Sequence, residues 1–475
     1  MSVFFRCYVC SILLILGIPA LFAQNCYTTP AFEVWVEQDV PYGQVEAYCG
    51  LSQNLSMDIY RPVGDGNLLR PAVVLIHGGA FLTGDKGSYD VAEAARAFAS
   101  RGYLAVSINY RLGFHKSVFY ANEATNCALL GALAGINNPQ CLYAYDKEVV
   151  RSLCRGVQDA RGAIRFVKNQ IDSVDVDNVF VGGSSAGGFI ALAVGYMGED
   201  EWPADAGALP DIYGGIPFAY WGCHANGALC SLERPALGPA QGELNLGGND
   251  ASVKGVLNIF GGLLSLGWID GGEPPLYAYH QDNDLVSPCT QGKPFDATLA
   301  QCVLNACSAI PNTWPASYGS CAIQEYLDTL ANAPAHEVWI DNCPLPSFPC
   351  SYSCHEVTMA SVNQIVANAA QFWSCLICPP GPGGCVLVGT AGHTRNSAEA
   401  ISLAPNPVRG ELRVTLPEGR DIWRVAFFNL AGQCVLRTLL SGSTTLDIGE
   451  LSPGFYLVRL EHGESAITRK IVVRW

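Results

Sequence analysis

Residues 178–197, NVFVGGSSAGGFIALAVGYM, decide the fold of this chain. Residues 179–181 are apolar, β-branched or aromatic and suit a buried strand, whereas residues 189–194 are apolar and lack proline, as a buried helix does. Between them lies a G-x-S-x-G pattern centred on Ser185. Small neighbours let strand and helix approach around a strained turn, and the helix amino terminus favours negative charge beside it. The pattern predicts a serine nucleophile at a strand-to-helix turn.

The competing interpretation of this stretch is the glycine-rich turn of a nucleotide-binding fold. That turn carries G-x-G-x-x-G, which does not occur here. A second motif, HGGAF at residues 77–81, directly follows the apolar run 72–76. Small residues there let backbone N–H groups turn toward a reacting oxygen. The two motifs together favour the serine nucleophile.

The rest of the chain up to residue 181 alternates between strand and helix patterns. Residues 55–60 alternate apolar and polar, which predicts a half-buried strand, and residues 104–109 read as a fully buried one. Helical spacing covers residues 91–100 and 155–171. This rhythm predicts an α/β fold with a mostly parallel sheet and helices on both faces.

A serine hydroxyl needs a base, an orienting acid and donors for the oxyanion. The backbone N–H groups of Gly79, Ala80 and Ala186 are the expected donors. His77, which precedes them, is expected to brace its loop and to take no part in catalysis. The sequence therefore predicts three backbone N–H donors for the oxyanion around Ser185.

The acid and the base are expected after Ser185, in the order Ser, Asp, His. Asp284 is the expected acid in the loop after a strand ending near residue 280, with Asp282 as its rival. His355, between a cysteine-rich loop and the predicted helix 357–373, is the expected base. The other downstream histidines occupy less suitable places: His336 opens an apparent final strand, His393 lies in a linker, and His462 lies in the C-terminal module.

Charge and composition exclude some functions. The 475-residue chain has 27 basic and 42 acidic residues, a formal charge of −15, and no basic stripe. Binding to nucleic acid or to an anionic membrane is therefore not expected. Residues 1–23 resemble a cleaved signal peptide, with a retained N-terminal anchor as the alternative.

Twenty cysteines fit an exported, disulfide-bonded chain. Cys223/Cys230 and Cys302/Cys307 are close pairs that suggest local bridges, although spacing does not fix the connectivity. Zinc is the competitor, but Cys375-x-x-Cys378 lacks a second half at suitable spacing. Neither a metal nor a cofactor is expected.

Three long segments interrupt the α/β rhythm, at residues 114–154, 199–252 and 289–335. Such segments are either lids and substrate-binding elements or stabilised decoration. A Pro- and Gly-rich linker at 379–400 follows the expected catalytic domain, 24–378. Residues 401–475 then show short strands separated by turn residues, which predicts a small all-β sandwich.

Four motifs together resemble the α/β-hydrolase superfamily, within it the carboxylesterase and hormone-sensitive-lipase-like esterases, including feruloyl-esterase-like members. They are HGGAF, NYRLG at 109–113, QDAR at 158–161 and GGSSAGG, and the resemblance covers about residues 55–373. The run His280-Gln-Asp-Asn-Asp284 is similar to the family's H-G-x-x-D acid loop but has Gln281 where the family usually has glycine. The register of that motif favours Asp284 over Asp282.

The C-terminal module is similar to the type A sorting domain of the type IX secretion system. The resemblance covers residues 402–475 and rests on PNPVRGEL at 405–412, NLAGQ at 429–433, LSPGFY at 451–456 and the terminal KIVV. It implies interaction with the secretion machinery, export to the cell surface or medium, and later removal of the module. A carbohydrate-binding or adhesion module is the alternative.

The sequence therefore predicts a secreted serine carboxylic-ester hydrolase that acts on a small or polymer-linked ester. A serine peptidase or amidase on the same fold is the first alternative, although the peptidases usually add an N-terminal β-propeller, for which residues 24–55 are too few. A non-catalytic surface protein that kept the fold is the second. The aromatic-rich residues 213–221 suggest an apolar pocket wall, and feruloyl or acetyl esters are plausible substrates.

Overall fold

The computed structural model describes residues 26–46, 52–67, 69–113, 147–209, 218–219, 229–230, 234–296, 314–344 and 354–378, and most of 402–474. The expected signal peptide, the linker and the pair Cys302/Cys307 lie outside these residues, as do Cys223 and the side chain of Cys230. The chain divides into two compact units, residues 1–390 and 391–475.

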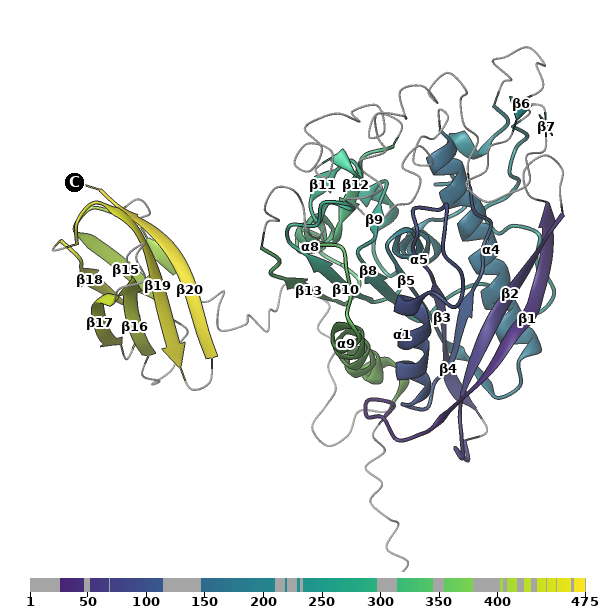
Figure 1. The fold of residues 1–475 in the computed structure, drawn as a ribbon, viewed down its shortest axis with the longest axis horizontal. Coiled ribbons are helices and arrows are strands. Elements are labelled where there is room, and N and C mark those ends of the chain that lie inside the picture. Colours follow the sequence, from purple (N-terminus) through teal and green to yellow (C-terminus); the bar gives the residue numbers. More distant parts are fainter. Residues whose placement is uncertain are drawn as a thin grey trace, which may run out of the picture. The chain divides into compact units, whose positions relative to one another are not determined.

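An eight-stranded sheet forms the centre of the first unit, in the order β1-β2-β4-β3-β5-β8-β10-β13 (Figure 1). Strands β4, β3, β5, β8, β10 and β13 run parallel to one another. Strand β2 pairs antiparallel with β4, and β1 pairs antiparallel with β2. The strands are β1 (Val34–Glu46), β2 (Ser52–Pro62), β3 (Arg70–Ile76), β4 (Leu104–Ile108), β5 (Val174–Ser184), β8 (Val256–Ile259), β10 (Leu276–Gln281) and β13 (His336–Asp341). The predicted mostly parallel sheet is confirmed.

Helices cover both faces of this sheet because its central strands are apolar on both sides. In β3, Val74 and Ile76 face the core that α4 and α5 bury, whereas Val73 and Leu75 face the core under α1 and α9. Figure 1 shows α4 beside α5 and α1 beside α9. The helices are α1 (Tyr89–Ala99), α4 (Glu148–Gln170), α5 (Ala186–Tyr196), α8 (Ser320–Leu327) and α9 (Met359–Ile377). This is the α/β-hydrolase arrangement that the sequence predicts.

Two local expectations were wrong. Strand β2 is not half-buried, since Asp58 and Tyr60 on its supposedly exposed face are also buried. Asp58 forms an ion pair with Lys86 at 2.9 Å, which lets a carboxylate lie inside. Helix α4 begins at Glu148, seven positions before the predicted start at residue 155, because buried ion pairs of Glu148 add to the burial of Val149 and Leu153 in its first turns.

Residues 199–209 and 234–250 of the second insertion lie along α4. Long polar side chains of that helix donate hydrogen bonds to their carbonyl oxygens. These bonds run from Arg151 to Asp205, Gly207 and Pro235, from Gln158 to Leu237 and Pro239, and from Arg165 to Gln241 and Leu244. This part of the insertion is therefore anchored to the fold.

Two small sheets belong to the insertions. The strands are β6 (Phe218–Ala219), β7 (Leu229–Cys230), β9 (Gly262–Leu263), β11 (Gln291–Gly292) and β12 (Ser317–Gly319). Strand β12 lies between β11 and β9 and leads directly into α8. The described residues of this unit also include two 3₁₀ turns, η5 (Ala204–Ala206) and η6 (Leu266–Trp268).

The second unit consists of antiparallel strands in two sheets, β14-β15-β18 and β17-β16-β19-β20. The strands are β14 (Ser402–Ala404), β15 (Glu411–Thr415), β16 (Trp423–Phe428), β17 (Cys434–Leu440), β18 (Thr444–Asp447), β19 (Gly454–His462) and β20 (Ser465–Val473). Alternate residues such as Leu412, Phe427 and Val458 are fully buried in one core. The predicted small all-β domain is confirmed. The strand patterns in the sequence, at 412–416, 425–428, 454–460 and 470–473, do not include β14, β17 or β18.

Candidate functional site

Ser185 lies at the turn between β5 and α5, with φ 53° and ψ −119°. This positive φ is strained for a residue with a side chain. The neighbouring glycines are required by close approach: a Cβ at Gly187 would lie 1.9 Å from the carbonyl oxygen of Ile76, and one at Gly183 would lie 2.1 Å from the carbonyl oxygen of Gly187. The G-x-S-x-G pattern therefore has the steric reason that the sequence analysis gave it.

His355 lies between Ser185 and Asp284. Its Nε2 atom is 2.8 Å from Oγ of Ser185, and its Nδ1 atom is 2.6 Å from Oδ2 of Asp284. The carboxylate is fully buried, whereas the imidazole is 12% exposed. The three side chains that the sequence singled out thus form one hydrogen-bonded chain.

Asp284 is held in the loop after β10 by backbone donors. Its Oδ1 atom accepts hydrogen bonds from the N–H groups of Val286 at 2.8 Å and Ser287 at 2.9 Å. Burial acts to raise the pKa of Asp284, but the charge of His355 and hydrogen bonds from His280 and His355 outweigh it, so the pKa lies below the usual value. Asp284 therefore remains a carboxylate.

Asp282 points elsewhere. Its Oδ1 atom accepts hydrogen bonds from the backbone N–H of Cys343 at 2.9 Å and from the side-chain amide of Asn283. It therefore caps the loop that follows β13. Of the two aspartates considered from the sequence, the structure brings Asp284 to His355.

The loop that carries His355 is fixed by covalent and aromatic contacts. Cys354, directly before it, has φ 52° and forms a disulfide with Cys343. The ring of Phe260 lies 4.7 Å from the imidazole, centroid to centroid. Sequence reasoning missed Phe260, which has a positive φ of 59° at the end of β8 but no motif to mark it.

The loop after β3 lies beside the serine, since a Cβ on Gly78 would be 3.0 Å from Cβ of Ser185. Ala80 and Phe81 both have positive φ, 55° and 60°, which is uncommon in two successive residues with side chains. Within the described residues, no turn or loop hydrogen bond uses the N–H group of Gly79, Ala80 or Ala186 as its donor. These are the three groups that the sequence analysis assigned to the oxyanion.

His77 lies at the base of this loop. Its Nδ1 atom donates to the carbonyl of Gly78 at 2.7 Å, and its ring stacks on Tyr110 at 4.5 Å. Tyr110 in turn donates to the carbonyl of His77. Burial lowers the pKa of His77, so it is neutral near pH 7. It braces the loop, as expected.

An apolar cavity borders the serine turn. It is lined by Phe81, Phe189, Trp314, Leu264, Leu153 and Val149, with two prolines, and its volume is about 10 Å³. Phe81 directly follows Ala80, and the N–H of Phe189 donates to the carbonyl of Ser185 at 3.1 Å. A cavity of this size holds about one water or methyl group.

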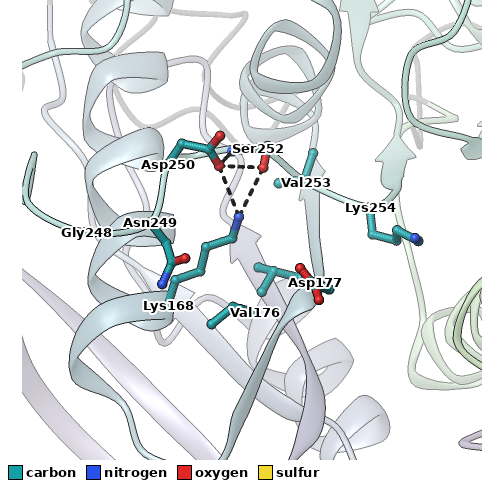
Figure 2. A pocket seen from close by; sticks show the side chains of 10 residues that line it. Lys168, Val176, Asp177, Gly248, Asn249, Asp250, Ser252, Val253 and Lys254 are labelled. Carbon is teal, nitrogen blue, oxygen red and sulfur yellow. Dashed lines mark hydrogen bonds and ion pairs between the residues drawn. The ribbon is translucent and has the colours of Figure 1, made fainter.

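A larger polar cavity of about 550 Å³ lies at the amino end of β5, lined by Asp177, Lys168, Asp250 and Lys254 among others. Figure 2 shows Lys168 reaching Asp250 and Ser252, while Lys254 points away. Eight strand positions separate Asp177 from Ser185, about 26 Å at the usual rise per residue. This cavity is therefore remote from the serine and takes no part in the candidate site.

The described part of the chain shows no cluster of three or more His, Cys, Asp or Glu side chains suited to hold a metal ion. Cys375 and Cys378, the pair considered for zinc, are both disulfide-bonded, and Cys378 pairs with Cys26. Among the helices of the described residues, none has the length and apolar character needed to cross a membrane.

Two family models match separate parts of the chain. Residues 57–130 match BD-FAE, a feruloyl-esterase-like α/β-hydrolase family. Residues 402–474 match the secretion system C-terminal sorting domain. Both resemblances inferred from the sequence are thus confirmed. The chain has an esterase-like α/β-hydrolase domain, and its sorting domain directs it through the type IX system to the cell surface or the medium.

Among solved structures, the chain is similar to esterase 2 of Thermogutta terrifontis. The form phosphorylated by paraoxon is 14% identical, with 73% of this chain and 96% of that chain covered and a TM-score of 0.37. The propionate-bound form is 15% identical, with 74% of this chain and 97% of that chain covered and a TM-score of 0.36. These overlaps are too loose to bear on activity. No curated protein matches the chain.

Proposed function

We propose that this protein is a secreted serine carboxylic-ester hydrolase. The observation that carries the proposal is the chain of two hydrogen bonds from Ser185 through His355 to Asp284, at 2.8 and 2.6 Å. The base lies within hydrogen-bond reach of the nucleophile, and a buried carboxylate orients the base. An ester is the substrate class because the chain carries an esterase-like domain.

In the proposed reaction, Oγ of Ser185 attacks the ester carbonyl carbon while Nε2 of His355 takes its proton. Asp284 accepts the Nδ1 hydrogen bond and stabilises the imidazolium. His355 then gives the proton to the departing alcohol, leaving an acyl group on Ser185. Water, deprotonated by His355, attacks this acyl-enzyme, and the proton returns to Ser185 as the acid leaves.

The negative oxygen of each tetrahedral intermediate would be held by the backbone N–H groups of Gly79, Ala80 and Ala186. Ala186 begins α5, where the first N–H groups have no partner within the helix. The helix amino terminus adds a partial positive charge. Loss of one such donor typically costs about 3–4 kcal/mol in the barrier. None of these steps uses a metal or cofactor.

The test is Ser185→Ala in the full chain, assayed with 4-nitrophenyl acetate. We expect loss of nearly all hydrolysis with an unchanged circular dichroism spectrum and melting temperature. An organophosphonate should label the wild-type protein at Ser185 and leave the variant unlabelled. Hydrolysis retained by the purified variant would refute the proposal.

The same assays separate the alternatives. A serine peptidase or amidase would share this chemistry, so a chromogenic peptide panel is run beside the ester panel. Cleavage of peptides faster than esters would favour that class. A non-catalytic surface protein would take no organophosphonate label at Ser185.

A further inference from the structure

His280 approaches the same carboxylate oxygen of Asp284 as His355 does. It is fully buried in β10, four positions before the aspartate. Its Nε2 atom lies 3.3 Å from Oδ2 of Asp284 and 2.9 Å from the carbonyl oxygen of Ser287. The catalytic scheme above leaves this histidine without a role.

The hydrogen-bond partners of His280 fix where its proton lies. A carbonyl oxygen such as that of Ser287 only accepts, so Nε2 must carry the hydrogen. The Nδ1 atom meets Oγ of Ser320 at 3.0 Å and the backbone N–H of Ser320 at 3.5 Å. With donors on that side, Nδ1 is the acceptor, which assigns the neutral form protonated at Nε2.

The direction of the Ser320 hydroxyl follows from Asn258 on β8. The backbone N–H of Gly261 donates to Oδ1 of Asn258 at 2.9 Å, which fixes the amide orientation. The Nδ2 atom of Asn258 must then donate to Oγ of Ser320, at 3.1 Å. Since Oγ of Ser320 accepts from Asn258, its hydrogen is directed to Nδ1 of His280.

From this geometry we infer that Asn258, Ser320 and His280 form a one-way relay that positions the acid of the proposed triad. His280 is a positioning residue: its Nε2–H group donates to the carbonyl oxygen of Ser287 and lies beside Oδ2 of Asp284, which is 3.3 Å from Nε2, so it holds that oxygen in line with His355. Oδ2 then accepts a hydrogen bond from His355 and faces the N–H group of His280, while Oδ1 accepts from two backbone N–H groups. The inference rests on the proposed function.

One aromatic ring links the two histidines. The Phe260 ring lies 4.7 Å from that of His355 and meets that of His280 edge-on at 5.7 Å. Phe260 follows β8, where Asn258 lies, and α8 begins with Ser320. Side chains from β8, α8 and β10 therefore converge at His280, beside Asp284.

The test compares His280→Ala with His280→Gln in the full chain. In the alanine variant Asp284 loses the polar N–H group that faces Oδ2, so its pKa rises, and its Oδ2 is no longer aligned. For 4-nitrophenyl acetate we expect kcat to fall about tenfold or more with KM changed less than about twofold, because alignment acts on the reaction rather than on binding. The acid limb of kcat/KM should move to higher pH.

Glutamine keeps an N–H donor at a similar reach. His280→Gln should therefore keep kcat within about threefold of wild type and leave the acid limb of kcat/KM at its wild-type pH. The matched control is His336→Ala, which removes another histidine beside a carboxylate, Asp328, at the amino end of β13. It should leave kcat and the pH profile unchanged.

The inference is overturned if folded His280→Ala keeps wild-type kcat and pH profile, or if His280→Gln is as impaired as alanine, which would indicate a packing role only. If His280→Ala does not fold, Ser320→Ala takes its place. It should shift the acid limb in the same direction by less, and an unchanged profile would contradict the relay. Failure of the proposed function looks different, since organophosphonate would then not label Ser185 even in wild type.

Discussion

The Nδ1 atom of His355 lies 2.6 Å from Oδ2 of Asp284, although 71 positions separate the two residues in the chain. The contact exists because β10 and β13 are parallel neighbours, so the loops after them leave the same edge of the sheet. Asp284 lies in the loop after β10, and His355 lies between β13 and α9. Their contact therefore depends on both loops keeping their positions.

Removing the disulfide between Cys343 and Cys354 should impair hydrolysis more than stability. Cys354 precedes His355 with φ 52°, and the bridge holds that strained backbone in place. We expect the double variant to serine to lose about tenfold or more in kcat/KM, since small displacements of a base are costly. The measurement is kcat/KM for 4-nitrophenyl acetate.

The matched control removes the bridge between Cys26 and Cys378, which joins the first described residues to the end of α9. It closes a much longer loop, so its loss should lower the free energy of unfolding by about 4 kcal/mol or more. It should leave kcat/KM within about twofold. Equal loss of activity in both variants would contradict the prediction.

The apolar cavity beside the serine predicts a preference for short acyl chains. Its volume of about 10 Å³ admits about one methyl group, and Trp314 and Phe81 form part of its wall with their rings 6.3 Å apart. Trp314→Ala should enlarge it and raise the activity ratio of hexanoate to acetate esters about tenfold or more, since accommodating even one further methylene is worth about 1–3 kcal/mol. A 4-nitrophenyl ester series measures this ratio.

Trp339→Ala provides the control for that series. Trp339 is on β13 and packs against Tyr279, away from the cavity lining. Its removal should leave the acyl-chain ratio unchanged. If Trp314→Ala also leaves the ratio unchanged while remaining folded, the cavity does not hold the acyl group.

We expect the free energy of unfolding to decrease at low pH because His77 is buried in its neutral form. Burial lowers the pKa of His77 below its usual value of 6.5, so between these two values the unfolded chain binds more protons than the folded one. The free energy of unfolding therefore decreases as pH falls from about 6.5 toward the folded pKa, by about 1.4 kcal/mol for each unit of difference.

His77→Gln removes this titration. Urea unfolding at pH 7.5 and 5.5 should show a smaller pH-dependent loss for the variant than for wild type, whatever its absolute stability. Comparing the two proteins cancels the contribution of the C-terminal unit. Equal slopes would show that His77 is not the group responsible.

Glu148 should be a large contributor to stability at the start of α4. Its carboxylate is fully buried and lies 3.2 Å from Nε of Arg151 and 3.1 Å from Arg155. Glu148→Gln leaves three buried guanidinium groups, those of Arg151, Arg155 and Arg234, without this counterion, which should cost about 3–5 kcal/mol of unfolding free energy. The control, Glu93→Gln, removes a surface pair with Arg96 and should cost less than about 1 kcal/mol. Denaturant titration measures both.

Sequence alone determined the features that depend on neighbouring residues. The turn around Ser185, the buried strands β3 and β4 and the HGGAF loop follow from local pattern, because sterics and burial act within a few positions. Local pattern predicted only a small all-β module at the C-terminus, and the resemblance of its motifs to a known family identified the sorting domain. Pattern could not find β17 and β18, whose alternation is weak in the sequence, or the first turns of α4, where buried charged residues stand among the apolar ones.

Tertiary structure decided what depends on strand order. The motif register favoured Asp284 over Asp282, and the assembled structure separates them: Asp282 binds the backbone of Cys343, whereas Asp284 meets His355. His280 acquires its place against Asp284 in the same way, through Ser320, forty positions away. Turns and strands are predictable because steric effects act between adjacent residues. The contacts of His355 with Asp284 and Ser185, across 71 and 170 positions, form only once the sheet is assembled.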